Sequence, residues 1–265
     1  MSEHSGAGNP ATILRLLWRH QRVSTEALRG RRPRLSIDRV IETAVALADA
    51  GGLAAASIHH VAKALGVGSM TLYTYVPSKA ELLDLMVDAI MAERDLPLAG
   101  DPAPEGWRAR VDLYVDRTRA MLRRHPWAPQ VSMTRPPLGP GTMAAREYLV
   151  ATFADTSLSP RQINAVAQAV GAFVDGAAAM EVRELEVERL TGQSQEVWWH
   201  ERQVFWDEYF DVERYPAIAR LWHAGGYDDP QPPGAEQGPY AFGLDRMLVG
   251  IDQLITLSRQ PAPER

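Results

Sequence analysis

The chain has 265 residues, and 46% of them are hydrophobic, which is typical of a soluble globular protein. It contains no cysteine, so a disulfide framework, a thiolate nucleophile and a cysteine-ligated zinc site are excluded. No apolar stretch approaches the ~20 residues of a membrane-spanning helix, and residues 13–18 are too short for the core of a signal peptide. We therefore expect a cytoplasmic protein.

The formal net charge of −5 is unevenly distributed along the chain. The first 35 residues hold seven arginines against Glu3 and Glu26, a net charge of +5, whereas residues 36–91 carry −3 and the remainder −7. Overall charge governs mainly solubility and nonspecific attraction, so a basic end on an acidic body favours local, oriented binding of phosphates.

The hydrophobic periodicity after the basic segment predicts helices at 36–51, 57–65, 69–75 and from 78 onward. Ser57 is placed to cap the second helix, and Gly66 permits a tight turn into the third. Pro77 disfavours helical geometry in the residue before it and so ends the third helix. Residues 78–81 form a capping box that starts the fourth.

Residues 97–104 contain three prolines and a glycine and predict a linker between two domains. Beyond them the sequence predicts helices at 105–124, 141–155, 160–191, 195–212 and 239–258. Every recognisable element is helical, so the predicted fold class is all-α.

Residues 57–79 have the layout of a helix-turn-helix DNA reader, in which a close-packed first helix supports a second that presents short polar groups to base edges. The candidates are Gly68, Ser69 and Thr71 for base edges, Met70 for thymine methyls, Tyr73, Tyr75 and Lys79 for phosphates, and Ser57, His59 and His60 from the supporting helix. The alternative is that the two tyrosines complete a small core and the histidines are merely solvated.

Residues 36–91, above all 67–83, resemble the N-terminal domain of the tetracycline-repressor (TetR) family of bacterial regulators. Residues 123–127 and 242–248 are similar to the C-terminal domain of its drug-responsive branch. The resemblance implies a three-helix DNA-binding head, a connecting helix and an all-helical body for dimerisation and effector binding. It also implies base contacts by Ser69, Met70 and Thr71 and phosphate contacts by Tyr73, Tyr75 and Lys79.

We accordingly divide the chain into four parts. They are a basic extension at 1–35, a DNA-binding domain with its connecting helix at 36–91, a dimerisation and effector-binding domain at 92–258, and a tail at 259–265. In the extension, Arg29, Arg31, Arg32 and Arg34 form a cluster that can enter a narrow minor groove. The alternative is a solubilising tail.

Two helices of the body carry apolar faces that predict a symmetric four-helix dimer interface. One face consists of Ile163, Val166, Ala167, Val170, Val174, Ala177 and Ala178, and the other of Leu244, Met247, Leu248, Ile251, Leu254 and Ile255. A dimer with twofold symmetry predicts a palindromic operator with half-sites about 34–36 Å apart, or a multiple of that distance.

The effector site is the least specified part of the sequence. Candidate lining residues are Trp127, Met133 and Met143 around a proline-rich kink, with Asn164, Gln168 and Asp175 along one line of the helix at 160–191. That line is alternatively a solvated face. An aromatic face of Trp198, Phe205, Trp206, Tyr209 and Phe210 favours core packing over a ligand box.

The sequence therefore predicts a ligand-responsive repressor that binds DNA as a homodimer, is released by a bulky small molecule, and controls an efflux pump or antibiotic-related gene. The alternatives are an architectural DNA-binding protein, which the acidic body disfavours, and a helical enzyme. The chain has no nucleophile elbow, phosphate-binding glycine loop or His-Glu-x-x-His pair, so we expect no catalysis, metal or cofactor.

Overall fold

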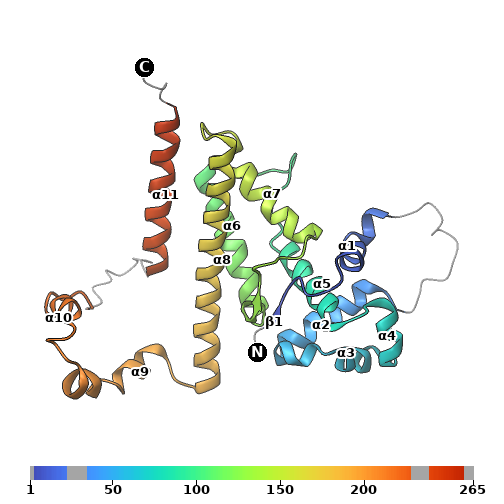
Figure 1. Cartoon of the computed structure of the whole chain (residues 1–265), viewed down its shortest axis with the longest axis horizontal. Helices are drawn as coiled ribbons and strands as arrows, with labels where there is room; N and C mark the ends of the chain where they lie inside the picture. The colour runs from blue at the N-terminus through green and yellow to red at the C-terminus, as the bar shows by residue number, and fades with distance from the viewer. Residues whose placement is uncertain (1–2, 23–34, 228–238, 260–265) are drawn as a thin grey trace. The chain divides into compact units, whose positions relative to one another are not determined.

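A computed structural model describes residues 3–22, 35–227 and 239–259 (Figure 1). The chain forms two compact units, of which the first comprises Met1–Val182 and Gly250–Arg265 and the second Arg183–Val249. Apart from one pair of two-residue strands, the regular elements in the described ranges are helices. The predicted all-α class is confirmed.

The head contains the predicted helices within a residue or two of the expected bounds. These are α2 (Ile37–Gly51), α3 (Ile58–Leu65), α4 (Ser69–Tyr75) and α5 (Lys79–Ala92). Serine side chains cap three of them, since Ser36 accepts from the backbone N–H of Arg39 at 3.2 Å and Ser57 from that of His60 at 3.2 Å. The side chain of Ser78 caps α5 in the same way.

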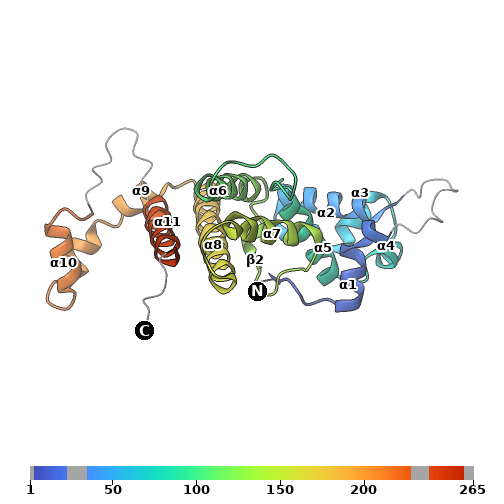
Figure 2. The same cartoon turned by 90° about the horizontal axis from the view of Figure 1, so that it is seen from above.

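A compact core holds these helices together. Val40 and Ala44 of α2, Val61 of α3 and Leu72 of α4 are all 0% exposed. Figure 2 shows the head helices gathered at one end of the first unit. Because Leu72 is the buried residue of α4, that helix is fixed to the core by one side and leaves its other sides open.

The N-terminal segment is a folded part of the first unit. Its strand β1 (Glu3–His4) pairs in parallel with β2 (Val131–Ser132), and α1 (Pro10–Leu17) buries Ile13, Leu16 and Leu17. The solubilising-tail interpretation is therefore wrong for residues 3–22. The sequence analysis did not predict α1 because its apolar pattern extends over only about two helical turns.

Two buried carboxylates of α5 receive this segment. Asp84 accepts hydrogen bonds from the hydroxyl of Ser5 at 2.6 Å and the backbone N–H of Gly6 at 2.9 Å. Glu81 accepts from the backbone N–H of Asn9 at 2.8 Å. Since a buried carboxylate without donors is strongly unfavourable, Asp84 requires the N-terminal segment in place, whereas Glu81 keeps a second donor in the hydroxyl of Ser78.

A third carboxylate joins α5 to the body. Asp88 accepts hydrogen bonds from the backbone N–H of Gly141 at 3.2 Å and of Thr142 at 2.9 Å, at the first turn of α7 (Pro140–Ala154). The two helices meet so closely here that a Cβ on Gly141 would lie 2.1 Å from the carbonyl oxygen of Asp88. Only glycine fits this crossing.

The remaining helices of the first unit are α6 (Trp107–Arg124), α8 (Pro160–Thr191) up to Val182, and the part of α11 (Pro239–Ser258) from Gly250 onward. The prediction that the valine face of α8 forms a dimer interface is wrong, because that face is packed inside its own subunit. Its buried members are Val166, Ala167, Val170, Val174 and Ala178.

The opposite face of α8 is open and made of small residues, namely Ala165, Ala169, Ala172 and Gly176. Valines on one side and alanines on the other make α8 long and apolar enough, by length and composition, to cross a membrane. Burial of the valines in a protein core accounts for that apolarity.

The second unit departs from the prediction of one helix at 195–212. The chain forms α9 (Gln195–His200), a π-helical turn at Phe205–Tyr209, and α10 (Pro216–His223), which the sequence reading missed. Bulky aromatic residues are poor helix formers, and here their rings pack on one another instead. Trp206 lies 5.0 Å from Phe210 and 5.0 Å from Trp222 between ring centroids.

Candidate nucleic-acid interface

The turn between α3 and α4 has the geometry that the sequence predicts. Gly66 ends α3 in the left-handed region, with φ 69° and ψ 30°, and its backbone N–H bonds to the carbonyls of α3. Val76 is extended before Pro77 and closes α4. Two short helices thus meet through a tight turn.

The face of α4 opposite Leu72 is exposed. Met70 is 78% exposed and Tyr73 43% exposed, and Gly68 and Thr71 are exposed beside them. Exposure at this level is incompatible with a core role for Tyr73. Tyr75, in contrast, is half-buried and packs partly against the core. Ser69, at the first position of α4, is also half-buried.

The supporting helix α3 presents a second row of polar groups. His59 and His60 are both exposed, and their ring centroids lie 5.9 Å apart. The ring nitrogen Nδ1 of His60 lies 3.2 Å from the carbonyl oxygen of Ala55, which orients that ring. Ser57 is occupied as the helix cap, so its structural role accounts for its hydroxyl.

Lys79, the remaining candidate, begins α5 with its side chain 48% exposed and forms an ion pair with Glu3. A phosphate must therefore compete with this carboxylate for the ammonium group. The predicted arm residues Arg29, Arg31, Arg32 and Arg34 lie outside the described residues.

Three exposed basic residues of the first unit were not among the candidates. Arg15 of α1, Arg39 of α2 and Lys63 of α3 are exposed, and none of them has a side-chain hydrogen bond or ion pair to another described residue. The signal for Lys63 was its place on the exposed side of the supporting helix. Arg15 had no such signal, because its position depends on how α1 packs.

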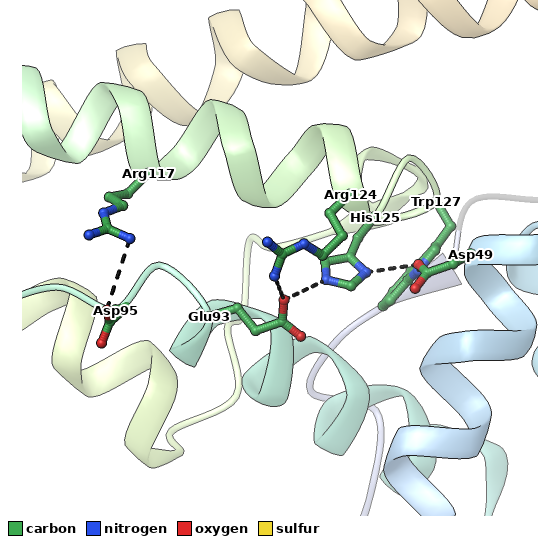
Figure 3. A network of polar contacts seen from close by, with 7 residues as sticks. All are labelled: Asp49, Glu93, Asp95, Arg117, Arg124, His125 and Trp127. Carbon is green, nitrogen blue, oxygen red and sulfur yellow. Dashed lines mark hydrogen bonds and ion pairs between the residues drawn. The ribbon is translucent and has the colours of Figure 1, made fainter.

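A buried polar node joins this head to the body (Figure 3). The imidazole of His125, 2% exposed after the end of α6, lies between two carboxylates: Nδ1 is 2.8 Å from Asp49 of α2 and Nε2 is 3.0 Å from Glu93 after α5. The indole of Trp127 also donates to Asp49, at 2.7 Å. Each carboxylate thus has a second partner besides the imidazole, since Trp127 donates to Asp49 and Arg124 donates to Glu93.

Glu93 is held as a carboxylate by this node. Burial raises its pKa, but hydrogen bonds from His125 and Arg124 outweigh burial, so the pKa of Glu93 lies below its usual value. The guanidinium of Arg124 donates to it at 2.8 Å.

The next residue along the chain, Arg94, faces the body. Its guanidinium, only 4% exposed, donates to Asp175 of α8 at 2.8 Å and to the hydroxyl of Tyr114 of α6 at 3.2 Å. Burial raises the pKa of Tyr114, and its hydroxyl donates a hydrogen bond to the carboxylate of Asp175 at 3.1 Å. Asp175 is itself 47% exposed.

The six predicted effector residues do not form one cluster. Trp127 is 1% exposed and belongs to the His125 node, whereas Met133 and Met143 are half-buried. Asn164 and Gln168 are exposed and lie within 3.5 Å of each other, and Asn164 also accepts from Arg146 at 3.0 Å. Asp175 lies in the Arg94 cluster described above.

A short, exposed helix that follows a glycine turn and is fixed by one buried leucine can enter a major groove while neighbouring tyrosine, lysine and arginine side chains reach phosphates. In an all-helical chain, this defines a helix-turn-helix DNA-binding protein.

Comparison with known proteins agrees with a helix-turn-helix DNA-binding protein. Residues 40–86 match the model for bacterial regulatory proteins of the tetR family, and residues 99–255 match the tetracyclin repressor-like C-terminal domain. The chain is 36% identical over 258 residues to the HTH-type transcriptional repressor DrrR1 of Streptomyces coeruleorubidus, covering 97% of this chain and 91% of that protein. The chain therefore belongs to the TetR family and is a transcriptional regulator with a DNA-binding and a ligand-binding domain.

Two other similarities are more distant. An HTH-type transcriptional regulator of Saccharopolyspora erythraea is 31% identical over 150 residues, which cover 57% of this chain and 62% of that protein. The TetR family protein ActR of Streptomyces coelicolor, solved in complex with (S)-DNPA, has a TM-score of 0.63 at 24% identity and covers 83% of this chain and 98% of its own. ActR has also been solved in complex with actinorhodin.

Proposed function

We propose that the protein is a cytoplasmic repressor that binds a palindromic operator as a homodimer and is released by a bulky small molecule. The observation that carries this proposal is the exposed face of α4, with Met70, Thr71 and Tyr73 open to solvent on a helix fixed from behind by Leu72. Ser69, Met70 and Thr71 face bases, and Tyr73, Tyr75 and Lys79 hold phosphates, with Gly68, His59 and His60 beside them.

The dimer forms through the small-residue face of α8. Ala165, Ala169, Ala172 and Gly176 recur at helical spacing and let a second copy approach closely, whereas the valines behind them are already buried. A Cβ on Gly176 meets no atom of the described residues within 4 Å. Gly176→Leu should therefore leave the subunit folded and reduce dimerisation, as measured by analytical ultracentrifugation. An unchanged dimer would exclude this face.

Effector release acts through the end of α5. Glu93 contacts the node that holds α2, and the adjacent Arg94 contacts Asp175 and Tyr114 of the body. A ligand bound beside Asp175 competes with Arg94 for the Asp175 carboxylate and so acts on the turn that positions the head. The shift in DNA affinity equals the difference in the ligand's affinity for the two states of the protein.

The regulated gene encodes an efflux pump or an antibiotic-related function. Support comes from the relative named as a repressor and from the structural neighbour that binds actinorhodin. Polycyclic aromatic compounds are therefore the first effectors to test.

A gel shift and footprint on the DNA upstream of the chain's own gene test the proposal. A short footprint with twofold symmetry, dissolved by actinorhodin or another polycyclic aromatic compound, is the expected result. Coating without a boundary would indicate an architectural protein, and absence of binding would remove the repressor assignment. Asp175→Asn, which removes the carboxylate that pairs with Arg94, should weaken DNA binding without any compound and respond less to the compound; Asp155→Asn, at an exposed site after α7, is the control.

A further inference from the structure

A groove of about 420 Å³ runs along the head between α1, the start of α2 and the end of α4. Its apolar lining comes from Leu16, Ile37 and Pro77, and its polar lining includes Arg15, Arg19 and Tyr75. The groove exists only because the N-terminal segment folds onto the head. It shares Tyr75 with the helix that the proposed function places on DNA.

The two arginines of this groove differ. Arg19 is paired with Asp38, and its guanidinium also donates to the carbonyl oxygen of Leu16 at 2.9 Å. Arg15 is exposed and makes no hydrogen bond or ion pair with any residue that the structure describes. It is therefore the cation of the groove that is available to a ligand.

The packing of α1 fixes where Arg15 lies. Leu16 and Leu17 are 7% and 3% exposed on the face that meets the head. The indole of Trp18 donates to the carbonyl oxygen of Leu138 at 2.8 Å and anchors the end of the helix. A charge held on a rigid helix loses less conformational freedom on binding than one on a free arm.

We propose that this groove binds the sugar–phosphate backbone of the operator, with the Arg15 guanidinium on a phosphate next to the one reached by Tyr75. The inference rests on the proposed function of α4. Charge favours a polyanion, since the free group is a guanidinium, and an arginine-rich segment would be repelled. The apolar lining suits a deoxyribose, and continuity with Tyr75 places the site along the same strand. Contacts of this kind add affinity without sequence preference.

This site is tested by measuring how the DNA affinity of the Arg15→Gln variant changes with salt concentration. Each lost phosphate contact lowers the slope of log affinity against log salt by about 0.9, so loss of one contact per subunit in a dimer lowers it by about 1.8. The matched control is Arg161→Gln, which removes the same charge from an exposed arginine in the first turn of α8. The probe is the DNA upstream of the chain's own gene, alongside random DNA of equal length.

The expected result is a shallower slope for Arg15→Gln than for Arg161→Gln, by a similar amount on both DNA probes, and loss of hydroxyl-radical protection at the outer edges of the footprint. Equal slopes for the two variants, with wild-type protein bound, would overturn the inference and leave the proposed function intact. Failure of the wild-type protein to bind would overturn the proposed function itself. Circular dichroism melting checks that both variants remain folded.

Discussion

Replacing Asp84 by alanine tests whether the N-terminal segment belongs to the fold. Asp84 is 1% exposed, and one of its oxygens accepts from both the hydroxyl of Ser5 and the backbone N–H of Gly6. The substitution removes both hydrogen bonds at once and takes away the acceptor of the Ser5 hydroxyl, in a residue only 2% exposed.

The size of the effect follows from these contacts. Hydrogen bonds to a charged group contribute roughly 1.5–3 kcal/mol each, so the pair accounts for about 4 kcal/mol. These values are net of the desolvation that folding imposes on the groups, so we expect the free energy of unfolding to fall by about 4 kcal/mol. Ser5→Ala, which removes one bond, should cost about 1–2 kcal/mol.

Urea unfolding followed by tryptophan fluorescence measures these values, at one protein concentration because the stability of the proposed homodimer would depend on it. Asp155→Ala, at an exposed aspartate after α7, is the control. If Asp84→Ala lowers stability no more than Asp155→Ala, the packing of residues 3–22 on α5 contributes nothing to the fold, and the reasoning fails. Additive effects of Ser5→Ala and Asp84→Ala would likewise show that the two side chains do not interact.

Three further predictions concern pH, packing and base reading. Because the pKa of Glu93 lies below its usual value of 4.5, its contribution to stability is complete above that pH and is lost as pH falls through the lower folded value; urea midpoints between pH 7 and pH 3 should fall less steeply in Glu93→Gln. Gly141→Ala places a Cβ 2.1 Å from the carbonyl oxygen of Asp88 and should cost about 1–3 kcal/mol or more, measured by urea unfolding, whereas Gly250→Ala, with open space at its Cβ, should not destabilise. Thr71→Ala should change base preference in gel shifts, whereas Tyr73→Ala should weaken specific and random DNA alike; equal losses on both for Thr71→Ala would show that this residue does not read bases.

The head could be predicted from the sequence because its boundaries are local signals. A serine cap at Ser57, a glycine turn at Gly66 and a proline at Pro77 each act within a few residues of themselves. The exposed face of α4 followed from the same spacing. Which of its side chains read bases remains a prediction.

The rest depends on contacts between distant parts of the chain. The face of α8 was assigned wrongly because the helix has two apolar faces, and periodicity cannot tell which one is buried in the subunit. The carboxylates of Asp84 and Asp88 read as ordinary polar positions until their partners, 79 and 54 residues away for Ser5 and Thr142, are brought beside them. The break after α9 likewise reflects ring packing with Trp222 of α10.

The folded N-terminal segment also decides how the predicted arm can be tested. Deleting residues 1–34 would remove one donor of Glu81 and both donors of Asp84 together with the arginines. Replacing Arg29, Arg31, Arg32 and Arg34 by glutamine keeps residues 3–22 in place. A slope of log affinity against log salt that is unchanged by these replacements would exclude the arm from the DNA interface.

The acidic residues of α5 have a consequence for hybrid regulators made by exchanging heads between family members. A junction placed in the proline-rich stretch at 97–104 would give α5 a foreign sequence while leaving its donors at Thr142 and His125 behind. A transplanted head would need carboxylates at the positions of Asp88 and Glu93. Without them the backbone amide of Thr142 and the imidazole of His125 would lose these hydrogen bonds. The connecting helix α5 therefore cannot be exchanged independently of the body. To transfer the proposed operator specificity, it is better to exchange the α3–α4 surface alone.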